Sequence, residues 1–284
     1  MLVNMDQVLK DAKRNRYAVG LFNTVDLEFA RGVLDAAEKL NAPVIIGTAE
    51  ILFPYGPLEE LSCFLLPMAK KAKVPVVVHL DHGLRYETCV KALELGFTSV
   101  MYDCSQESYD ENVRRVREMA DIAHSFGATI EGELGHVGDN EDAGMKRPED
   151  FYTDPAIAHD YVEKTKVDAL AIAVGNAHGA YKFPPKLDFE RIRKIAETVN
   201  VPLVLHGGSG LTDDDFKTAI KEGISKVNIF TDINRAALMA AGKGYEEGKK
   251  GFTDIVPSVI DAISRETQKK ILLFGSQGKG NELS

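Results

Sequence analysis

The chain of 284 residues lacks tryptophan, a long apolar run and an excess of basic side chains. A membrane-spanning helix needs about 20 consecutive apolar residues, and no stretch approaches that length. Residues 1–16 carry charges throughout and do not contain the apolar centre of a signal peptide. These absences argue against an integral membrane protein and predict a cytoplasmic one.

Cysteine is also scarce. Cys63, Cys89 and Cys104 form no CxxC pair, and their odd number argues against a disulfide framework. We therefore expect three buried thiols in a reducing compartment. The formal net charge is −9, and lysine and arginine are not clustered as a nucleic-acid surface requires. An anionic substrate would instead need local groups, such as backbone N–H groups, helix N-termini or a metal.

Short apolar runs alternate with longer amphipathic segments along the whole chain. Several runs are almost continuously apolar, which is typical of parallel strands buried on both faces. Gly96, Gly127 and Gly223 stand where helices should end before the next strand. The predicted strands are residues 17–22, 43–47, 74–80, 99–103, 129–133, 169–174, 202–206 and 226–230. The predicted helices include residues 27–40, 85–95, 111–126, 189–199 and 216–222, after a short amphipathic helix within residues 1–16.

Eight strand–helix units predict an α/β fold, a closed (β/α)8 TIM barrel that forms one domain over residues 1–284. A doubly wound open sheet is the alternative, but no GxGxxG motif follows the first strand. Residues 134–154 form a long Gly- and Asp-rich loop, which predicts a functional lid or a disordered excursion. We expect one extra helix at about residues 254–270, followed by a glycine-rich surface tail.

Three histidines each follow the end of a predicted strand, and they carry the strongest functional signal. His82, His178 and His206 occupy the third, sixth and seventh strand ends. The active groups of such barrels come from these C-terminal strand ends, so the three imidazoles should converge. Three protein ligands leave a fourth position open for substrate, as in catalytic zinc centres. Nitrogen ligands favour zinc, although cobalt, iron or manganese also fits.

Carboxylates stand near these histidines. Asp81 precedes His82 directly, so it is a metal ligand, an orienting group or a proton carrier. Asp103 and Glu133 end the fourth and fifth strands and either offer ligands to a second metal position or bind histidine ring N–H groups. His79 lies inside its strand, where a packed or orienting role is expected.

Two segments have features of a phosphate site. After His206, a Gly-Gly-Ser209-Gly turn leads to a helix start, and such turns expose N–H groups. Asn228-Ile-Phe-Thr231 ends the eighth strand, and phosphate sites formed after strands seven and eight recur in barrels. Lys182, soon after His178, can supply a balancing cation.

Six motifs stand at strand ends along essentially the whole chain. They are Gly20-Leu-Phe-Asn23, His79-Leu-Asp-His82-Gly, Glu131-Gly-Glu133-Leu-Gly, Gly175-Asn-Ala-His178-Gly, Leu205-His206-Gly-Gly-Ser209-Gly and Val227-Asn228-Ile-Phe-Thr231. With them the chain resembles the class II, metal-dependent ketose-bisphosphate aldolases. The resemblance implies reversible cleavage of a tagatose- or fructose-type 1,6-bisphosphate into dihydroxyacetone phosphate and an aldehyde such as glyceraldehyde 3-phosphate.

The resemblance also implies roles for particular residues. His82, His178 and His206 match the zinc ligands, and Asp81 matches the catalytic acid/base beside the metal. Glu141, in the long loop, matches the glutamate that moves the C3 proton. A monovalent cation, Na⁺ or K⁺, is implied near the phosphate, and a homodimer or homotetramer is implied for the assembly.

Glu133 and Asp103 match carboxylates near an alternate metal position. The remaining matches form the implied substrate pocket. Its members are Asn23, Gly179, Lys182, Gly207, Gly208, Ser209, Asn228, Ile229, Phe230 and Thr231.

The chain departs from the family pattern where the aldehyde half of the substrate should bind. Fructose-specific members usually carry aspartate at the position of Phe230, and tagatose-specific relatives tend to have a small apolar residue there. Glu50 would repel a distal phosphate if it pointed inward, and Arg235 stands one position beyond an expected basic residue. An aldolase acting on a ketose 1-phosphate with a different distal group is therefore an alternative.

Two other classes of protein stay open at this point. A different metal-dependent barrel enzyme, such as an epimerase or amidohydrolase, usually needs more ligands on its early strands. A non-catalytic phosphosugar-binding subunit would not need Asp81 and Glu141, and both residues are present.

Overall fold

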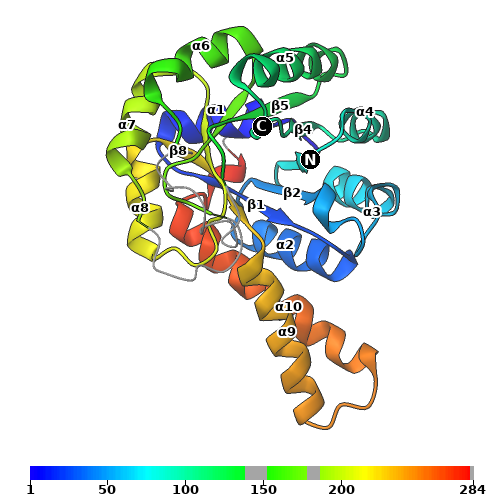
Figure 1. The fold of residues 1–284 in the computed structure, drawn as a ribbon. Coiled ribbons are helices and arrows are strands. Elements are labelled where there is room, and N and C mark those ends of the chain that lie inside the picture. Colours follow the sequence, from blue (N-terminus) through cyan, green and yellow to red (C-terminus); the bar gives the residue numbers. More distant parts are fainter. Residues whose placement is uncertain (138–151, 178–185, 282–284) are drawn as a thin grey trace.

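Eight parallel strands close into a barrel in which each strand pairs with the next and β8 returns to β1 (Figure 1). The computed structural model describes residues 1–137, 152–177 and 186–281. The strands are β1 (Val19–Asn23), β2 (Val44–Ala49), β3 (Val76–Gly83), β4 (Ser99–Tyr102), β5 (Thr129–Leu134), β6 (Ala169–Ile172), β7 (Leu203–Leu205) and β8 (Ile224–Ile229). The predicted (β/α)8 barrel is therefore confirmed.

Helices surround the barrel, and most of them cover the outer faces of its strands (Figure 1). They are α1 (Met5–Asn15), α2 (Leu27–Lys39), α3 (Leu58–Lys71), α4 (Tyr86–Leu95), α5 (Tyr109–Ser125), α6 (Pro155–Thr165), α7 (Phe189–Thr198), α8 (Asp213–Glu222), α9 (Thr231–Glu246) and α10 (Phe252–Phe274). Short 3-10 helices follow β2 (η1, Glu50–Leu52) and α10 (η3, Lys279–Asn281). None of the described helices is long and apolar enough to cross a membrane.

The barrel has two apolar regions because side chains alternate along each strand. Outward-facing side chains such as Val76, Val78 and Leu80 pack against the helices. Inward-facing side chains such as Val77 and Ile45 form a second cluster with the buried face of α1. Helix α1 therefore closes the amino-terminal end of the barrel, and the carboxyl-terminal end is left for polar side chains.

Helices α9 and α10 form a hairpin that extends beyond the barrel (Figure 1). The base of α10 packs closely on α2, where a side chain larger than hydrogen at Gly32 would meet Ile263 and the carbonyl of Ile260. The extra helix was predicted at about residues 254–270, and it runs from Phe252 to Phe274. It is longer because its last turn packs on the barrel, burying Ile271 and Phe274.

One sequence expectation was incomplete and another was wrong. The glycine-rich tail lies at the surface, with Gly275, Gln277 and Gly278 exposed. It is also anchored, because Ser276 is buried and the N–H groups of Gly278 and Gly280 donate to the carbonyls of Leu40 and Asn41. Cys63 is exposed on α3, whereas Cys89 and Cys104 are buried as expected. Cys63 occupies a position on the solvent side of an amphipathic helix, which a count of cysteines does not reveal.

Candidate metal centre

The alternation of side chains brings polar groups together inside the carboxyl-terminal half of the barrel. On β3, Val77 faces the apolar end, and His79 and Asp81 follow on the same side toward the open end. On β5 the same spacing directs Glu131 and Glu133 inward. All four polar side chains are nearly or completely buried. The site is therefore an interior polar layer, built by period-two alternation.

His82 breaks this alternation, and the backbone changes conformation to permit it. The pairing of β3 with β4 shifts register between Leu80 and Gly83, which marks a bulge. Within this bulge His82 has a φ of 43°, in the left-handed region that non-glycine residues seldom adopt. Adjacent residues of a regular strand point to opposite faces, but the bulge lets the His82 imidazole and the Asp81 carboxylate point to the same side. Strain of this kind is often found at functional sites.

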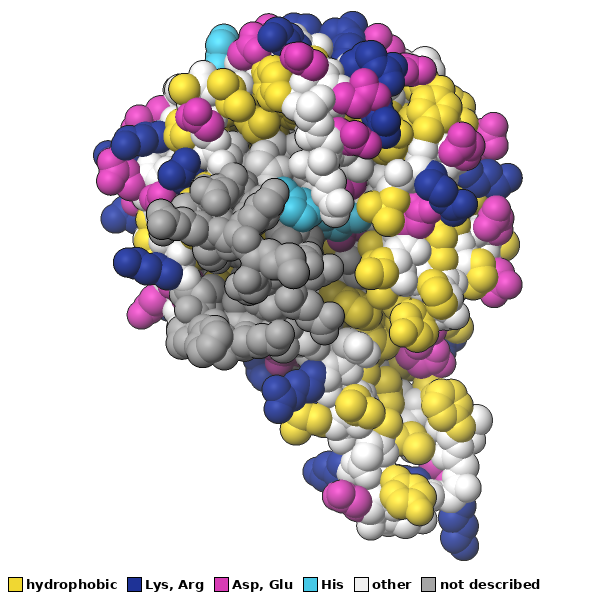
Figure 2. Space-filling view, in the orientation of Figure 1, with side chains coloured by type: hydrophobic (Ala, Val, Ile, Leu, Met, Phe, Trp, Pro, Cys, Tyr) yellow, Lys and Arg dark blue, Asp and Glu magenta, His cyan; other side chains and the backbone are white. Residues whose placement is uncertain are grey.

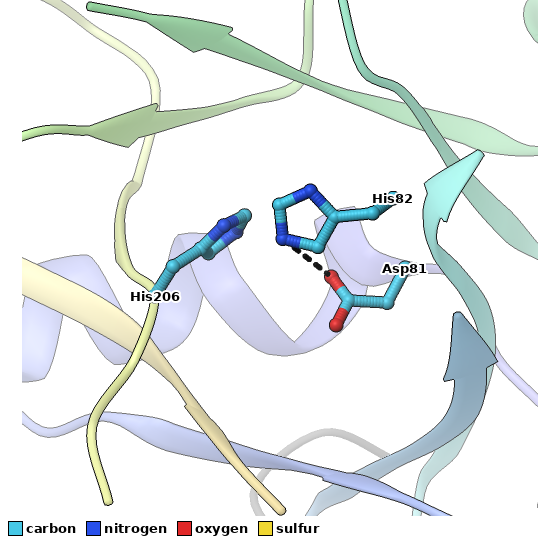
Figure 3. A group of neighbouring side chains, drawn as sticks. All are labelled: Asp81, His82 and His206. Atoms are coloured by element: carbon cyan, nitrogen blue, oxygen red, sulfur yellow. Dashed lines mark ion pairs between the residues drawn. The ribbon is translucent and has the colours of Figure 1, made fainter. Parts of the chain in front are cut away.

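His82, His206 and Asp81 converge at the open end of the barrel (Figure 3). One ligand atom from each lies within 4.8 Å of the others. The Nε2 atom of His82 is 3.9 Å from Oδ1 of Asp81. The two imidazole rings meet edge to face, with centroids 4.5 Å apart. Two ligands at about 2 Å from one zinc ion lie within about 4 Å of each other, so this spacing suits a single ion.

Each histidine is held from behind by a carboxylate. The Nδ1 atom of His82 is 2.7 Å from Oδ2 of Asp103, and Ser105 donates to the other oxygen of Asp103. The Nε2 atom of His206 is 2.8 Å from Oε1 of Glu131. Metal-binding histidines commonly donate their second ring N–H to a carboxylate in this way. The donor set and its supports therefore fit a divalent metal, with Nε2 of His82 and Nδ1 of His206 as the ligand atoms.

Asp103 and Glu133 both contact histidine ring nitrogens. Glu133 places Oε2 3.2 Å from Nδ1 of His206. This is the nitrogen that would face the metal, so Glu133 stands beside the metal position rather than behind its ligand. Its other oxygen accepts from the N–H of Val137.

Asp81 is fixed between two amides. Asn23 donates to Oδ2 at 2.8 Å, and Asn228 donates to Oδ1 at 2.9 Å. Burial alone would raise the pKa of Asp81, but the positive charges of His82, His206 and Lys226 lower it well below its usual range. Asp81 is therefore ionised and oriented, as a proton acceptor beside a metal must be.

The pKa of the His206 imidazole is shifted in the opposite direction, upward. Burial lowers its pKa, but the hydrogen bonds and charges of Glu131 and Glu133 outweigh burial and raise the pKa to about 10. Without a metal, His206 is therefore protonated at neutral pH, and both ring nitrogens face carboxylates. The carboxylates that attract this proton would also attract a metal cation in its place.

The loop after β7 and the end of β8 contain the residues that were predicted to bind a phosphate. Gly207 has a φ of 63°, and a side chain at Gly208 would meet Val227. Ser209 is 6% exposed, and its Oγ has no hydrogen-bond partner among the described residues. A buried hydroxyl in this state is expected to bind something else, and it lies beside the Gly-rich turn. The Ser209 hydroxyl is therefore a donor at the place where a phosphate is expected, whereas the N–H of Gly208 already donates to the carbonyl of Asn228.

The end of β8 leads directly into α9. Ile229 is fully buried as the last strand residue, and Thr231 begins the helix. Phe230 lies between them, partly buried against the outer core, with its ring centroid 6.4 Å from that of Phe29. The structure thus places an apolar ring where many relatives were expected to have an aspartate.

Glu50 does not point inward as a free charge. Its carboxylate accepts from the N–H groups of Leu84 and Arg85 at the start of α4, and it forms an ion pair with the Arg85 guanidinium. Burial raises the pKa of Glu50, but these contacts outweigh burial and lower it overall. The repulsion considered from the sequence is therefore largely neutralised. Arg235 is exposed on α9.

Four predicted site residues lie outside the described residues. They are Glu141, His178, Gly179 and Lys182. Two buried residues of the site were not predicted as functional: Glu131, which supports His206, and Lys226, which is 2.8 Å from Glu131. Both lie at inward positions of their strands, so strict period-two counting from Glu133 and Asn228 could have found them.

Comparisons with known proteins give the family context. A family model described as fructose-bisphosphate aldolase class-II matches residues 3–279. A protein of Escherichia coli strain K12 named uncharacterized protein YdjI is 39% identical over 279 residues, which cover 98% of this chain and 99% of that protein. A fructose-bisphosphate aldolase of Staphylococcus aureus strain Mu50 is 37% identical over 288 residues, with coverage of 98% and 99%. The crystal structure of the YdjI aldolase from Escherichia coli K12 has a TM-score of 0.89 at 38% identity, covering 99% of this chain and all of that one.

The protonation of His206 predicts how metal binding depends on pH. The pKa of His206 is raised from 6.5 to about 10, so the ring must lose a proton before its nitrogen can bind a metal. Below that pKa, metal affinity should rise by about tenfold for each pH unit per proton released. Calorimetric titration of the metal-free protein with Zn²⁺, in buffers of different ionisation enthalpy, should detect the proton release. A metal affinity that does not change with pH would contradict the prediction.

Proposed function

Because the chain belongs to the class II fructose-bisphosphate aldolase family, whose members are metal-dependent carbon–carbon lyases, we propose that it cleaves a ketose 1,6-bisphosphate of the tagatose or fructose type. The products would be dihydroxyacetone phosphate and an aldehyde such as glyceraldehyde 3-phosphate, and the reaction would be reversible. The observation that carries the proposal is the ionised Asp81, fixed by two amides beside the converging His82 and His206.

We propose Zn²⁺ as the metal, held by His82, His178 and His206, with Glu133 and Asp103 near it. Other divalent ions fit the same donor set. When bound, the metal supplies Lewis acidity to the substrate carbonyl and so makes neighbouring protons acidic. A monovalent cation, Na⁺ or K⁺, is proposed beside the substrate phosphate.

Asp81 is the proposed base of the cleavage step. Its carboxylate takes the C4 hydroxyl proton while the C3–C4 bond breaks, and C4 becomes the aldehyde carbon. The electron pair of the broken bond stays on the dihydroxyacetone phosphate half, and Glu141 then returns a proton to C3. Asn23 and Asn228 keep both oxygens of Asp81 oriented through this sequence.

The proposed phosphate pocket lies at the Gly207–Ser209 turn, with Gly179 and Lys182 completing it. Support comes from Oγ of Ser209, which is buried without a partner among the described residues. The N–H groups of a glycine-rich turn can approach a phosphate closely. Asn228 directs its amide to Asp81, so we assign it to the reacting end of the substrate rather than to the phosphate.

The aldehyde half of the substrate is where a second candidate has support. Phe230 places an apolar ring at the last strand end, which favours a tagatose-type sugar or a ketose 1-phosphate with a different distal group. A non-catalytic phosphosugar-binding subunit is less favoured, because Asn23 and Asn228 hold the Asp81 carboxylate as the proposed base requires. We also expect a cytoplasmic location, which cell fractionation would test.

Replacing Asp81 with alanine should lower turnover by about 10²–10⁴-fold, because the C4 proton loses its acceptor. Zinc content, measured by atomic absorption, should stay that of the wild-type protein. Turnover close to wild type would contradict the assignment. As an independent control, exhaustive treatment with EDTA should abolish cleavage, and borohydride with substrate should trap no covalent adduct.

Phe230 provides a test of substrate choice. Phe230→Asp should shift the ratio of kcat/KM toward fructose 1,6-bisphosphate and away from its tagatose isomer, because an ionised acceptor can bind a sugar hydroxyl. A charged hydrogen bond of about 2 kcal/mol corresponds to about 30-fold. Phe230→Ala is the matched control, since it removes the ring without adding an acceptor, and it should leave the ratio unchanged. Equal shifts in both variants would contradict the proposed role.

We further propose that the protein is a homodimer or homotetramer whose subunits meet through the α9–α10 hairpin. The hairpin exposes large apolar side chains (Figure 2), namely Leu238 at 72%, Met239 at 65%, Tyr245 at 80% and Phe252 at 72%. Such patches are typical of interfaces. Sedimentation should therefore detect an oligomer that Leu238→Glu with Tyr245→Glu dissociates. The control Phe126→Glu, at the exposed apolar residue that caps the carboxyl end of α5, should not dissociate it, and a wild-type monomer would contradict the proposal.

A further inference from the structure

Lys226 is a lysine enclosed within the barrel. It lies in the middle of β8, paired in register with Val204 on β7 and Val19 on β1, and it is 0% exposed. Its Nζ atom is 2.8 Å from Oε2 of Glu131 and 2.8 Å from Oδ1 of Asn228. Burying an ammonium group is costly unless it is paired and hydrogen-bonded, and lysines are almost never fully buried otherwise.

The two partners of Lys226 lead to two different parts of the site. Glu131 receives Lys226 on one oxygen and contacts Nε2 of His206 with the other, at 2.8 Å. Asn228 accepts from Lys226 through its carbonyl oxygen and donates to Asp81 through its amide nitrogen, at 2.9 Å. The ammonium is therefore one side chain away from both a proposed metal ligand and the proposed base.

The chemistry of Lys226 also fixes the orientation of the Asn228 amide. An ammonium group has donors only, and a carboxylate has acceptors only. The amide between them must therefore turn its oxygen to Lys226 and its nitrogen to Asp81. Without the lysine, that preference is lost on one side, and Asp81 can lose one of its two donors. The same argument applies to Glu131, whose two oxygens are divided between Lys226 and His206.

The ammonium also decides where a metal can bind. His79, Asp81 and Glu131 place ligand atoms within 4.8 Å of one another, deeper in the barrel than the cluster of Figure 3. Lys226 already neutralises Glu131 there, so a metal cation would meet a like charge. Burial and then Lys226 lower the pKa of His79 to about 3, and its Nδ1 is 2.7 Å from Oγ of Ser99. The ammonium of Lys226 thus already provides the positive charge beside His79, Asp81 and Glu131. A metal is therefore favoured at the cluster of Asp81, His82 and His206.

We propose that Lys226 is a positioning residue of the active site, which holds His206 through Glu131 and Asp81 through Asn228. A contribution to stability alone does not account for this arrangement, because buried ion pairs can often be replaced by apolar residues without loss of stability. The inference rests on the proposed metal-dependent function, but it concerns how the metal ligand and the base are held.

The test compares Lys226→Met with Lys13→Met. Both substitutions remove a lysine ammonium, but Lys13 is at the amino-terminal end of the barrel, where it donates to the carbonyls of Val199 and Val201. Zn²⁺ affinity is measured by competition with a chromophoric chelator, and the geometry is followed through the visible spectrum of the Co²⁺-substituted protein. Circular dichroism establishes that each variant is folded. The values of kcat and KM are measured with the ketose phosphate that the wild-type protein cleaves.

Lys226→Met should weaken metal binding by about 10–100-fold, as losses of ligand-supporting groups do. Its Co²⁺ spectrum should change, and kcat should fall more than KM rises. Lys13→Met should lower thermal stability without changing the metal affinity or the spectrum. A folded Lys226→Met variant with wild-type metal affinity, spectrum and kcat would overturn the proposal.

If Lys226→Met does not fold, the double variant Lys226→Met with Glu131→Gln removes both members of the buried ion pair, and it is compared with Glu131→Gln alone because Glu131 itself contacts His206. The double variant should fold, bind metal more weakly than Glu131→Gln alone and give an altered Co²⁺ spectrum. Values equal to those of Glu131→Gln alone would overturn the proposal. Failure of the wild-type protein to bind any divalent metal would overturn the proposed function as well, whereas metal binding without cleavage of any ketose phosphate would overturn only that function.

Discussion

The closed ring of parallel strands is the constraint on which the rest of the structure depends. Because every strand turns alternate side chains into one enclosed space, the residues at inward positions must be compatible with all the others there. At the amino-terminal end they are apolar and join the buried face of α1. At the carboxyl-terminal end several are ionisable, and because these side chains are buried, their mutual charge balance is decisive.

This balance explains why so many charges are tolerated in one small volume. Lys226 and the His206 imidazolium lie within 3.2 Å of carboxylate oxygens of Glu131 and Glu133, so the positive and negative charges offset one another. The pKa of Glu131 falls to about 2, because Lys226 and His206 outweigh the effect of burial. A metal ion that replaces the His206 proton adds positive charge to a layer that already has carboxylates to receive it. The barrel interior is thus arranged for cations before any ion is bound.

The sequence was sufficient for the architecture and for much of the site, for one physical reason. The carboxyl ends of all strands in a parallel barrel lie on the same face. Because His82, His206 and Asp81 each stand at the end of an apolar run, their proximity could be predicted from the sequence. What could not be predicted depends on contacts between distant segments. The left-handed backbone of His82 arises from a bulge against β4, and the role of Glu131 depends on His206 lying opposite it. The exposure of Cys63 and the anchoring of the residues after α10 were missed for the same reason, because burial there is decided by which neighbour packs against the chain.

Glu50 illustrates why the metal half of the site is easier to infer than the aldehyde half. Around the metal, each side chain has a partner whose chemistry is specified by its own strand position. Glu50 looks like a repulsive charge in the sequence, yet the N–H groups at the start of α4 and the guanidinium of Arg85 neutralise it. We infer that the charge around the proposed aldehyde end of the site is set by loop–loop pairing rather than by residue type at one position. Phe230 adds a second such dependence, because its ring packs against Phe29 from the start of α2. We infer that, in the proposed reaction, substrate choice follows from contacts between successive loops, whereas the metal and proton chemistry follows from the strands.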